Sequence, residues 1–319
     1  MRKKETVLLM GMPRAVPAST YVLVTAAYNE EKYIERVIAA VLSQSVLPKR
    51  WIIVSDASSD RTDEIVRNYA EENPFIELVR IAEDHARNFA AQVNAINVGM
   101  ARCCGSDYEF IGNLDADVSF EADYFERLLA KFEKDPHLGL AGGDIWEEAG
   151  GHFRPRYTNN PSAVAHAVQL FRRRCFESLG GYTALPYGGP DSHAEVLCRM
   201  NGWHVRSHDD LPVFHHRPCG GAGHWASAAY RQGLMDYSLG IHPGFEILRL
   251  LRRVFQRPYG AYAIVRLFGF IRANWDGGPR PVSVQFVRYL RSEQRDRMLR
   301  VVADRLSALT GRESKESKE

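Results

Sequence analysis

Short apolar runs alternate with amphipathic segments throughout the first half of the chain. Residues 21–25, 51–54, 76–79 and 108–114 are compact and apolar, as expected of buried β-strands. Between them, apolar residues recur every three or four positions, which is the spacing of one helical face. This alternation predicts an α/β fold with a mostly parallel central sheet and helices on both of its faces. Ligands of such sheets bind beyond the carboxyl ends of the strands.

Polar residues mark the points at which the helices are expected to begin. Asn29 is predicted to be the N-cap of the first helix, with Glu30 and Glu31 in its first turn. Asp60 is predicted to cap the second helix in the same way.

The fourth apolar run ends in two carboxylates, Asp115 and Asp117, separated by one small residue. The two charges repel each other, so neither position suits a dry core. A divalent cation between them, completed by a phosphate-bearing ligand, would explain the pair; a solvated turn is the alternative. Asp56 also directly follows a strand, and all three carboxylates are therefore expected in one crevice.

The composition excludes several classes of protein. The 319 residues are 45% hydrophobic and 25% charged, as in an ordinary globular protein, and a net charge of +2 argues against a nucleic-acid partner. Five cysteines without a C-x-x-C pair indicate a reduced, intracellular protein. No apolar stretch reaches the roughly 18–20 residues that a membrane span requires.

Three motifs carry a resemblance to a known family. Thr25-Ala-Ala-Tyr-Asn-Glu-Glu31, Val54-Ser-Asp-Ala-Ser-Ser-Asp-Arg-Thr62 and Asn113-Leu-Asp-Ala-Asp117 resemble the nucleotide-sugar-binding motifs of family 2 glycosyltransferases with the GT-A fold. The resemblance covers roughly residues 20–225. It implies a Rossmann-like, GT-A type sheet flanked by helices and transfer of a sugar, with inversion, from a nucleotide-diphosphate donor. A UDP-sugar is the first expectation and a GDP-sugar the second.

The resemblance also implies roles for individual residues around the donor. Ala27, Tyr28 and Glu30 would border the base and ribose, and Asp56 would hydrogen-bond the base.

Asp115 would serve the ribose or a metal-bound water, and Asp117 would bind Mn²⁺ or Mg²⁺ on the diphosphate. Arg87 would add positive charge near the diphosphate, although a surface arginine is an equally good interpretation.

The acceptor side departs from the family pattern. Many members have Glu-Asp at the entrance of a helix, with the Asp as general base, whereas this chain has Pro190-Asp191. An inverting transfer needs a base for the acceptor hydroxyl. Asp191 is the first candidate and His193 the second, because imidazole titrates in the useful range. Glu195 is more simply interpreted as a structural residue at the helix N-terminus.

A pair of histidines follows the last predicted strand. Adjacent residues of an extended chain point to opposite sides, so at most one of His215 and His216 should face the crevice. That histidine would complete a metal shell or bind the diphosphate; two half-buried histidines are the alternative. Arg217 could pair with phosphate oxygens. The glycine-rich residues 218–224 suit either a closing loop or a plain connector.

Charge is concentrated in the C-terminal part. Residues 226–306 contain fourteen arginines, no lysine and six acidic residues. Basic amphipathic helices beside aromatic runs are typical of contact with an anionic membrane, but packing onto the catalytic domain is also compatible. We therefore expect a flexible segment (1–19), a catalytic domain (20–225), a basic helical appendage (226–306) and a disordered tail (307–319).

These observations together predict a cytoplasmic glycosyltransferase, peripherally attached to the inner face of the membrane, that adds one sugar to a glycan or lipid-linked acceptor. The chain lacks the Gln-x-x-Arg-Trp pattern associated with processive synthases. Two alternatives remain open. One is a non-catalytic sugar-nucleotide-binding or scaffold protein; the other is a nucleotidyltransferase, which should have a glycine- and lysine-bearing phosphate loop.

Overall fold

The computed structural model describes residues 19–82, 89–103, 105, 107–217, 225–253, 260–278 and 280–316. The expected flexible N-terminal segment lies almost entirely outside the described residues. From there, strands and helices alternate as β1 (Tyr21–Ala27), α1 (Ile34–Leu42), β2 (Arg50–Asp56), α2 (Thr62–Glu72), β3 (Ile76–Ile81), α3 (Phe89–Arg102) and β4 (Phe110–Leu114). This order confirms the α/β pattern predicted from the apolar runs.

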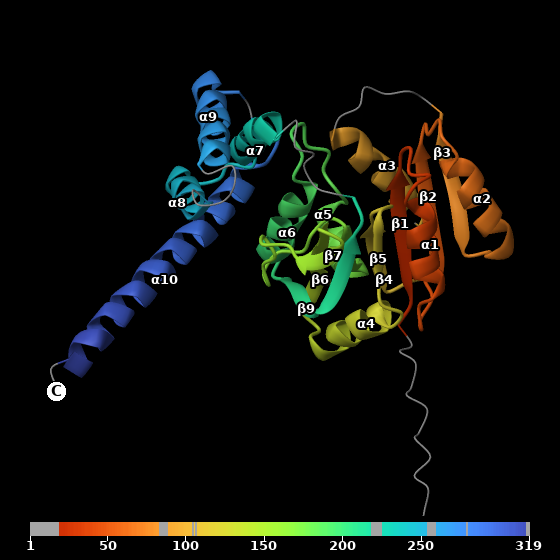
Figure 1. The fold of residues 1–319 in the computed structure, drawn as a ribbon, viewed down its shortest axis with the longest axis horizontal. Helices are drawn as coiled ribbons and strands as arrows, with labels where there is room; N and C mark the ends of the chain where they lie inside the picture. Colours follow the sequence, from red (N-terminus) through yellow and green to blue (C-terminus); the bar gives the residue numbers. More distant parts are fainter. Residues whose placement is uncertain are drawn as a thin grey trace, which may run out of the picture.

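The second half of the catalytic domain is richer in strands, and four helices follow it (Figure 1). The elements are β5 (Val118–Phe120), α4 (Tyr124–Lys134), β6 (Leu138–Ala149), β7 (His152–Pro155), β8 (Val168–Arg172), α5 (Arg173–Leu179), α6 (Pro190–Met200), β9 (His204–His215), α7 (Trp225–Ser238), α8 (Pro243–Arg253), α9 (Ala261–Asp276) and α10 (Val284–Glu316).

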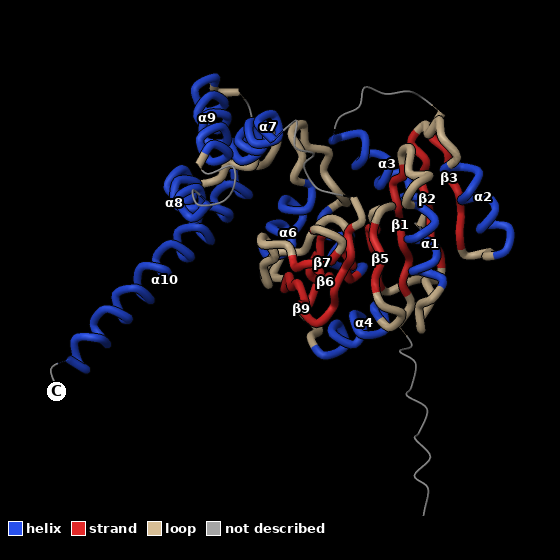
Figure 2. Tube along the Cα trace, in the orientation of Figure 1, coloured by secondary structure: helices blue, strands red, loops and turns tan. Residues whose placement is uncertain are grey.

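The described strands form one nine-stranded sheet in the order β3-β2-β1-β4-β8-β6-β9-β5, with β7 paired to β6. Strands β3, β2, β1 and β4 are parallel, as predicted. The remaining half is mixed, because β8 is antiparallel to both β4 and β6 while β9 is parallel to β6 and antiparallel to β5. Figure 2 shows these strands gathered in one body, with the C-terminal helices to one side.

Alternating side chains of the central strands build two separate cores. Tyr21 and Leu23 of β1 pack in one core with α1 and α4, whereas Val22 and Val24 pack in the other with α3 and α6. Side chains of a strand alternate between the faces of the sheet, so each strand contributes to both layers.

A third core joins the C-terminal helices to the catalytic domain. Val196 of α6 packs with Tyr237, Phe270 and Phe286, which come from α7, α9 and α10. Phe286 is 1% exposed, and burial of such a side chain stabilises the fold by about 2 kcal/mol. The basic region is therefore a helical unit packed on α6, one of the two arrangements that its composition allowed.

Two predictions for the C-terminal part concern its tail and the hydropathy of its helices. The tail predicted to be disordered from residue 307 is helical as far as Glu316, since α10 continues without interruption. Its residues include Arg, Leu, Ala and Glu, which are good helix formers. Among the described helices, none combines the length and hydropathy required to cross a bilayer.

Gly143 of β6 provides a test of the β6–β9 pairing. A Cβ at this position would lie 1.8 Å from the carbonyl oxygen of Leu211 in β9. We predict that Gly143→Ala lowers the free energy of unfolding by about 2 kcal/mol or more, because one strand must move. Chemical denaturation measures the change. Gly278→Ala, with nothing within 4 Å of the added Cβ, is the matched control; equal stability of the two variants would contradict the prediction.

Candidate functional site

The carboxyl ends of β1, β2 and β4 surround a cavity of about 280 Å³. The parallel strands end at the same edge of the sheet, so the turns that follow them are brought together. We call this the donor-side cavity. The described residues that were predicted to bind the base, the ribose, the diphosphate or its metal line it as follows: Ala27, Tyr28, Glu30, Asp56, Asp115, Asp117 and Arg217. Arg87 lies outside the described residues.

Strand pairing decides which histidine ring lies beside the Asp117 carboxylate. β5 starts one residue after Asp117 and pairs antiparallel with β9, which places Val118 opposite His215. The Nε2 atom of His215 lies 3.3 Å from a carboxylate oxygen of Asp117. The ring of His216 contacts Ser119 at 2.7 Å and Arg36 at 3.3 Å instead. The two rings thus point apart, as predicted: the His215 ring lies against the Asp117 carboxylate, whereas His216 reaches Asp117 only through its backbone nitrogen, which donates to the Asp117 carbonyl.

Arg217 bridges two of the cavity carboxylates. Its Nε lies 3.0 Å from Asp117, and its terminal nitrogen pairs with Glu30. Burial raises the pKa of Glu30 to about 7, against the opposing charge of Arg217, and the nearby Asp117 and Asp115 raise it further. The cavity therefore gathers several carboxylates, two of which share the positive charge of Arg217.

His166, which the sequence reasoning missed, is the partner of Asp115. Its Nδ1 lies 3.3 Å from the Asp115 carboxylate, and its carbonyl accepts a 2.6 Å hydrogen bond from Asn113. Burial alone would raise the pKa of Asp115, but the hydrogen bond and charge of His166 outweigh it and lower that pKa. Among the described residues, no partner contacts the buried Nε2 of His166. Sequence offers little signal here, because His166 lies in no recognisable motif.

The residues around Asp117 suit a divalent cation only in part. Within the described ranges, no group of three or more His, Cys, Asp or Glu side chains could hold a metal ion. Asp117 and His215 do offer an oxygen and a nitrogen ligand side by side, a donor set that Mn²⁺ accepts. A cation held there would need its remaining ligands from a bound molecule, and phosphate oxygens are of the required hard type.

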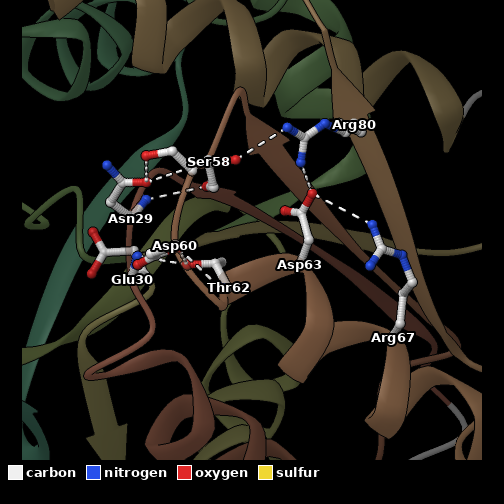
Figure 3. A network of polar contacts seen from close by, with 9 residues as sticks. Asn29, Glu30, Ser58, Asp60, Thr62, Asp63, Arg67 and Arg80 are labelled. Atoms are coloured by element: carbon white, nitrogen blue, oxygen red, sulfur yellow. Dashed lines mark hydrogen bonds and ion pairs between the residues drawn. The ribbon is translucent and has the colours of Figure 1, made fainter.

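Backbone-to-side-chain hydrogen bonds hold together the loops after β1 and β2 (Figure 3). The backbone nitrogen of Asn29 donates to Ser58, that of Glu30 to Thr62 and that of Glu31 to Asp60. These bonds fix the loop that carries Tyr28 and Glu30 against the helix that follows Asp56.

The predicted N-cap role of Asn29 is wrong. Helix α1 begins at Ile34, and Asn29 has a left-handed φ of 52°. Its side-chain oxygen accepts a hydrogen bond from the Ser59 nitrogen. An Asn side chain commonly bonds nearby backbone in this way, and here the tertiary contact with the second loop replaces a helix cap. Asp60 does accept a hydrogen bond from the Thr62 nitrogen at the start of α2.

A second and larger cavity, of about 1190 Å³, lies between the catalytic domain and the C-terminal helices. The catalytic domain contributes Asp191 and the preceding Gly188 and Gly189, and the helices contribute residues such as Arg231 and Tyr262. We call this the acceptor-side cavity. The participation of α7, α8 and α9 in its wall was not predicted, because it depends on how those helices pack.

The three candidate residues at the entrance of α6 have different surroundings. Asp191 lines the acceptor-side cavity. The ring of His193 stacks on Phe286 of α10 with centroids 4.7 Å apart, outside the lining of that cavity, and burial lowers its pKa to about 4. Glu195 accepts a 2.7 Å hydrogen bond from the Val164 nitrogen. Its role in the structure is to hold the loop before β8 rather than the helix N-terminus.

The pH dependence of stability tests the environment of Glu195. Burial and the neighbouring Asp191 raise its pKa to about 8, from 4.5. The folded protein therefore binds a proton that the unfolded chain releases, and this contribution to stability is lost as pH rises from about 4.5 to 8. We predict that Glu195→Gln removes a decline on the order of 2–4 kcal/mol across this window. Denaturation at several pH values measures it; parallel curves for wild type and variant would contradict the prediction.

Comparison with known proteins identifies relatives of the N-terminal half. The family described as "Glycosyl transferase family 2" matches residues 22–185. Poly-beta-1,6-N-acetyl-D-glucosamine synthase of Staphylococcus aureus (strain COL) is 33% identical over 119 residues, which cover 37% of this chain and 27% of that protein. The chain thus matches about a quarter of the length of this curated relative.

Solved structures share the fold over most of the chain. Mannosyltransferase PcManGT from Pyrobaculum calidifontis, in complex with GDP-Man and Mn²⁺, has a TM-score of 0.56 at 17% identity, covering 81% of this chain and 88% of that one. S. aureus TarS 1-349 in complex with UDP-GlcNAc has a TM-score of 0.57 at 15% identity, covering 86% and 82%. These likenesses confirm the predicted GT-A fold. Because the family match spans half of the sequence, this chain belongs to glycosyl transferase family 2.

Proposed function

We propose that the protein is an inverting, metal-dependent glycosyltransferase that moves one sugar from a nucleotide-diphosphate donor to a hydroxyl acceptor. The observation that carries the proposal is the arrangement of the donor-side cavity. Asp56, Asp115 and Asp117, from three separate motifs, line one cavity at the carboxyl ends of parallel strands. Family membership supports the reaction class.

The donor-side cavity suits a nucleotide-diphosphate sugar. Tyr28 is 41% exposed at its edge and offers an aromatic face to the base, while Asp56 offers a hydrogen-bond acceptor. Asp115, oriented by His166, would bind the ribose or a metal-bound water. A UDP-sugar is our first choice and a GDP-sugar the second. The fold neighbours TarS and PcManGT contain UDP-GlcNAc and GDP-Man respectively.

Asp117 and His215 would hold the cation, Mn²⁺ or Mg²⁺, with diphosphate oxygens completing its shell. When bound, the metal supplies Lewis-acid stabilisation of the departing diphosphate. Arg217 already lies beside Asp117 with a fixed positive charge, and a guanidinium pairs readily with phosphate oxygens. Its exchange of carboxylate for phosphate partners would couple donor binding to the rearrangement of this edge of the cavity.

Asp191 would be the general base. The side chain lines the acceptor-side cavity at the N-terminus of α6, where an acceptor hydroxyl can approach. Removal of the hydroxyl proton as the new bond forms is the task that an inverting displacement requires. His193 is the weaker candidate, since its ring stacks on Phe286.

We further propose a role in glycan or cell-envelope biosynthesis with a glycan or lipid-linked acceptor, at the cytoplasmic face of the membrane. The similarity to a poly-beta-1,6-N-acetyl-D-glucosamine synthase supports the envelope context. The arginine-rich C-terminal region supports the peripheral attachment. A non-catalytic sugar-nucleotide-binding protein is the alternative, favoured by the absence of the usual Glu-Asp pair at Pro190-Asp191.

Asp117 is the residue whose loss should separate these functions. In a thermal-shift panel of UDP-, GDP- and dTDP-sugars with Mn²⁺, the true donor should raise the melting temperature of the wild type. We predict that Asp117→Ala lowers metal-dependent release of nucleotide diphosphate at least about a hundredfold. Asp123→Ala, at a half-exposed carboxylate on α4, is the control. Donor binding without turnover for any acceptor would favour the scaffold protein.

Asp191→Asn tests the base assignment. We predict that transfer falls by roughly 10²–10⁴-fold while the donor-induced thermal shift is retained, because the base acts on the acceptor. Initial rates with a defined acceptor, measured beside His193→Leu, distinguish the two candidates. Full transfer activity of Asp191→Asn would show that the base is misassigned. Loss of transfer activity in a His193→Leu variant that folds like wild type would show the same.

A further inference from the structure

Helix α9 buries a charged side chain and exposes its large apolar side chains, which is the reverse of the usual arrangement in a surface helix. Its inner face buries Arg266, 3% exposed, beside Gly269 and Phe270. Its outer face carries large apolar side chains at spacings of four, three and four residues, with exposed fractions of 69% for Ile264, 61% for Phe268, 53% for Ile271 and 87% for Trp275. The stripe runs for about 16 Å along the helix.

Helix α8 repeats this reversal. Glu246 is fully buried, whereas Ile247 and Leu251 are 51% and 59% exposed. We call these two side chains and the four exposed residues of α9 the apolar stripe. The sequence pattern of α8 opposes Arg249 to these apolar residues, and the structure turns Arg249 inward.

A buried ionic cluster explains why the charged faces point inward. Arg266 lies 2.8 Å from Asp236 of α7 and 3.2 Å from Glu246 of α8, and Arg249 lies 2.9 Å from Asp236. Buried charges of opposite sign must stay paired, since an unpaired one is strongly destabilising. The cluster therefore fixes α8 and α9 in the orientation that exposes their apolar faces.

The helices also pack too closely to rotate. A Cβ on Gly233 of α7 would lie 2.1 Å from the Arg266 carbonyl oxygen, and a Cβ on Gly269 of α9 would lie 2.3 Å from that of Tyr230. Backbone contact at this distance leaves no freedom for α9 to turn its apolar side toward α7. The exposure of the apolar stripe is thus a consequence of rigid packing.

A row of large exposed apolar side chains along one helix face, as in α9, marks an interaction site. The net charge of the segment that carries the stripe indicates the partner. Residues 226–306 hold fourteen arginines against six acidic residues, a net charge of about +8. A second copy of the same surface would be repelled, whereas an anionic bilayer attracts arginine at about 1 kcal/mol per residue near its surface. Trp275, at one end of the stripe, is of the residue type favoured at the membrane interface.

We propose that the apolar stripe of α8 and α9 inserts into the surface of an anionic phospholipid bilayer. Tyr262 and Arg266 of the same helix line the acceptor-side cavity, so docking would hold that cavity close to the headgroups. The proposal deepens the peripheral attachment of the proposed function by assigning it to this surface, and the advantage for a lipid-linked acceptor rests on that function. α9 then has two sides, one lining the cavity and one contacting lipid.

Vesicle flotation of the full chain tests the proposal. Wild type should float with phosphatidylcholine vesicles that contain phosphatidylglycerol and remain unbound with phosphatidylcholine alone. The Ile264→Ser/Ile271→Ser double variant should bind the anionic vesicles about tenfold more weakly, because it removes two inserted side chains. The matched control is Leu47→Ser/Val98→Ser, at exposed apolar positions of the catalytic domain, and should bind like wild type.

Tryptophan fluorescence provides an independent measurement of insertion. Emission should shift to the blue on addition of anionic vesicles and should be quenched by brominated lipid, and Trp275→Phe should remove both effects. Equal flotation of the double variant and wild type, or no flotation of wild type, would overturn the proposal. The proposal would also be overturned if light scattering showed that wild type is a dimer and the double variant a monomer. The stripe would then be an interface between copies of the chain.

The donor-induced thermal shift distinguishes a failure of lipid docking from a failure of the proposed function. The double variant should keep the shift of the wild type, since the donor-side cavity contains no residue of α8 or α9. Loss of flotation with the shift retained supports lipid docking. Absence of any donor shift in all variants, with flotation intact, would contradict the proposed function and leave the docking surface standing.

Discussion

Parallel pairing of β1 with β2 and β4 is the constraint on which the donor-side cavity depends. It delivers the ends of three strands to one edge of the sheet, and with them Ala27, Asp56 and Asp115. The antiparallel pairing of β5 with β9 then adds His215 and Arg217 from nearly a hundred residues further along the chain. Hydrogen bonds between the loops at Asn29 and Ser58 make this edge rigid. The cavity is therefore a product of strand topology rather than of any single motif.

The concentration of carboxylates at this edge requires positive partners. Arg217 pairs with Asp117 and Glu30, and His166 pairs with Asp115. Burial raises the pKa of Glu30 to about 7 against the opposing charge of Arg217, and the nearby Asp117 and Asp115 raise it further. A divalent cation held beside Asp117 would add a positive partner at this edge and would balance the charge of the diphosphate that binds with it. The same principle governs the C-terminal helices, where Asp236 and Glu246 are buried only because Arg249 and Arg266 neutralise them.

Sequence predicted the features that depend on local pattern. The alternation of strands and helices and the gathering of Tyr28, Asp56 and Asp117 in one cavity follow from apolar spacing and from the rule that parallel strands end together. Features that depend on tertiary contacts could not be predicted from the sequence.

Asn29 adopts a left-handed conformation because it bonds a second loop, and His166 reaches Asp115 from outside every motif. The choice of His215 over His216 required the register of β5 with β9. The inward turn of Arg249 required the ionic cluster, which no helical periodicity reveals.

Electron paramagnetic resonance, which measures how much Mn²⁺ is free in solution, tests whether the donor-side cavity is a metal-assisted nucleotide-sugar site. We expect the protein alone to leave the free Mn²⁺ signal largely unchanged, because Asp117 and His215 offer too few ligands. The matching nucleotide diphosphate itself binds Mn²⁺, so in its presence wild type should deplete the signal beyond the protein-free mixture, and Asp117→Ala should not. Depletion that does not exceed that of the protein-free mixture with any nucleotide diphosphate, or depletion that is equal in the Asp117→Ala variant, would contradict the assignment of this cavity as a metal-assisted nucleotide-sugar site.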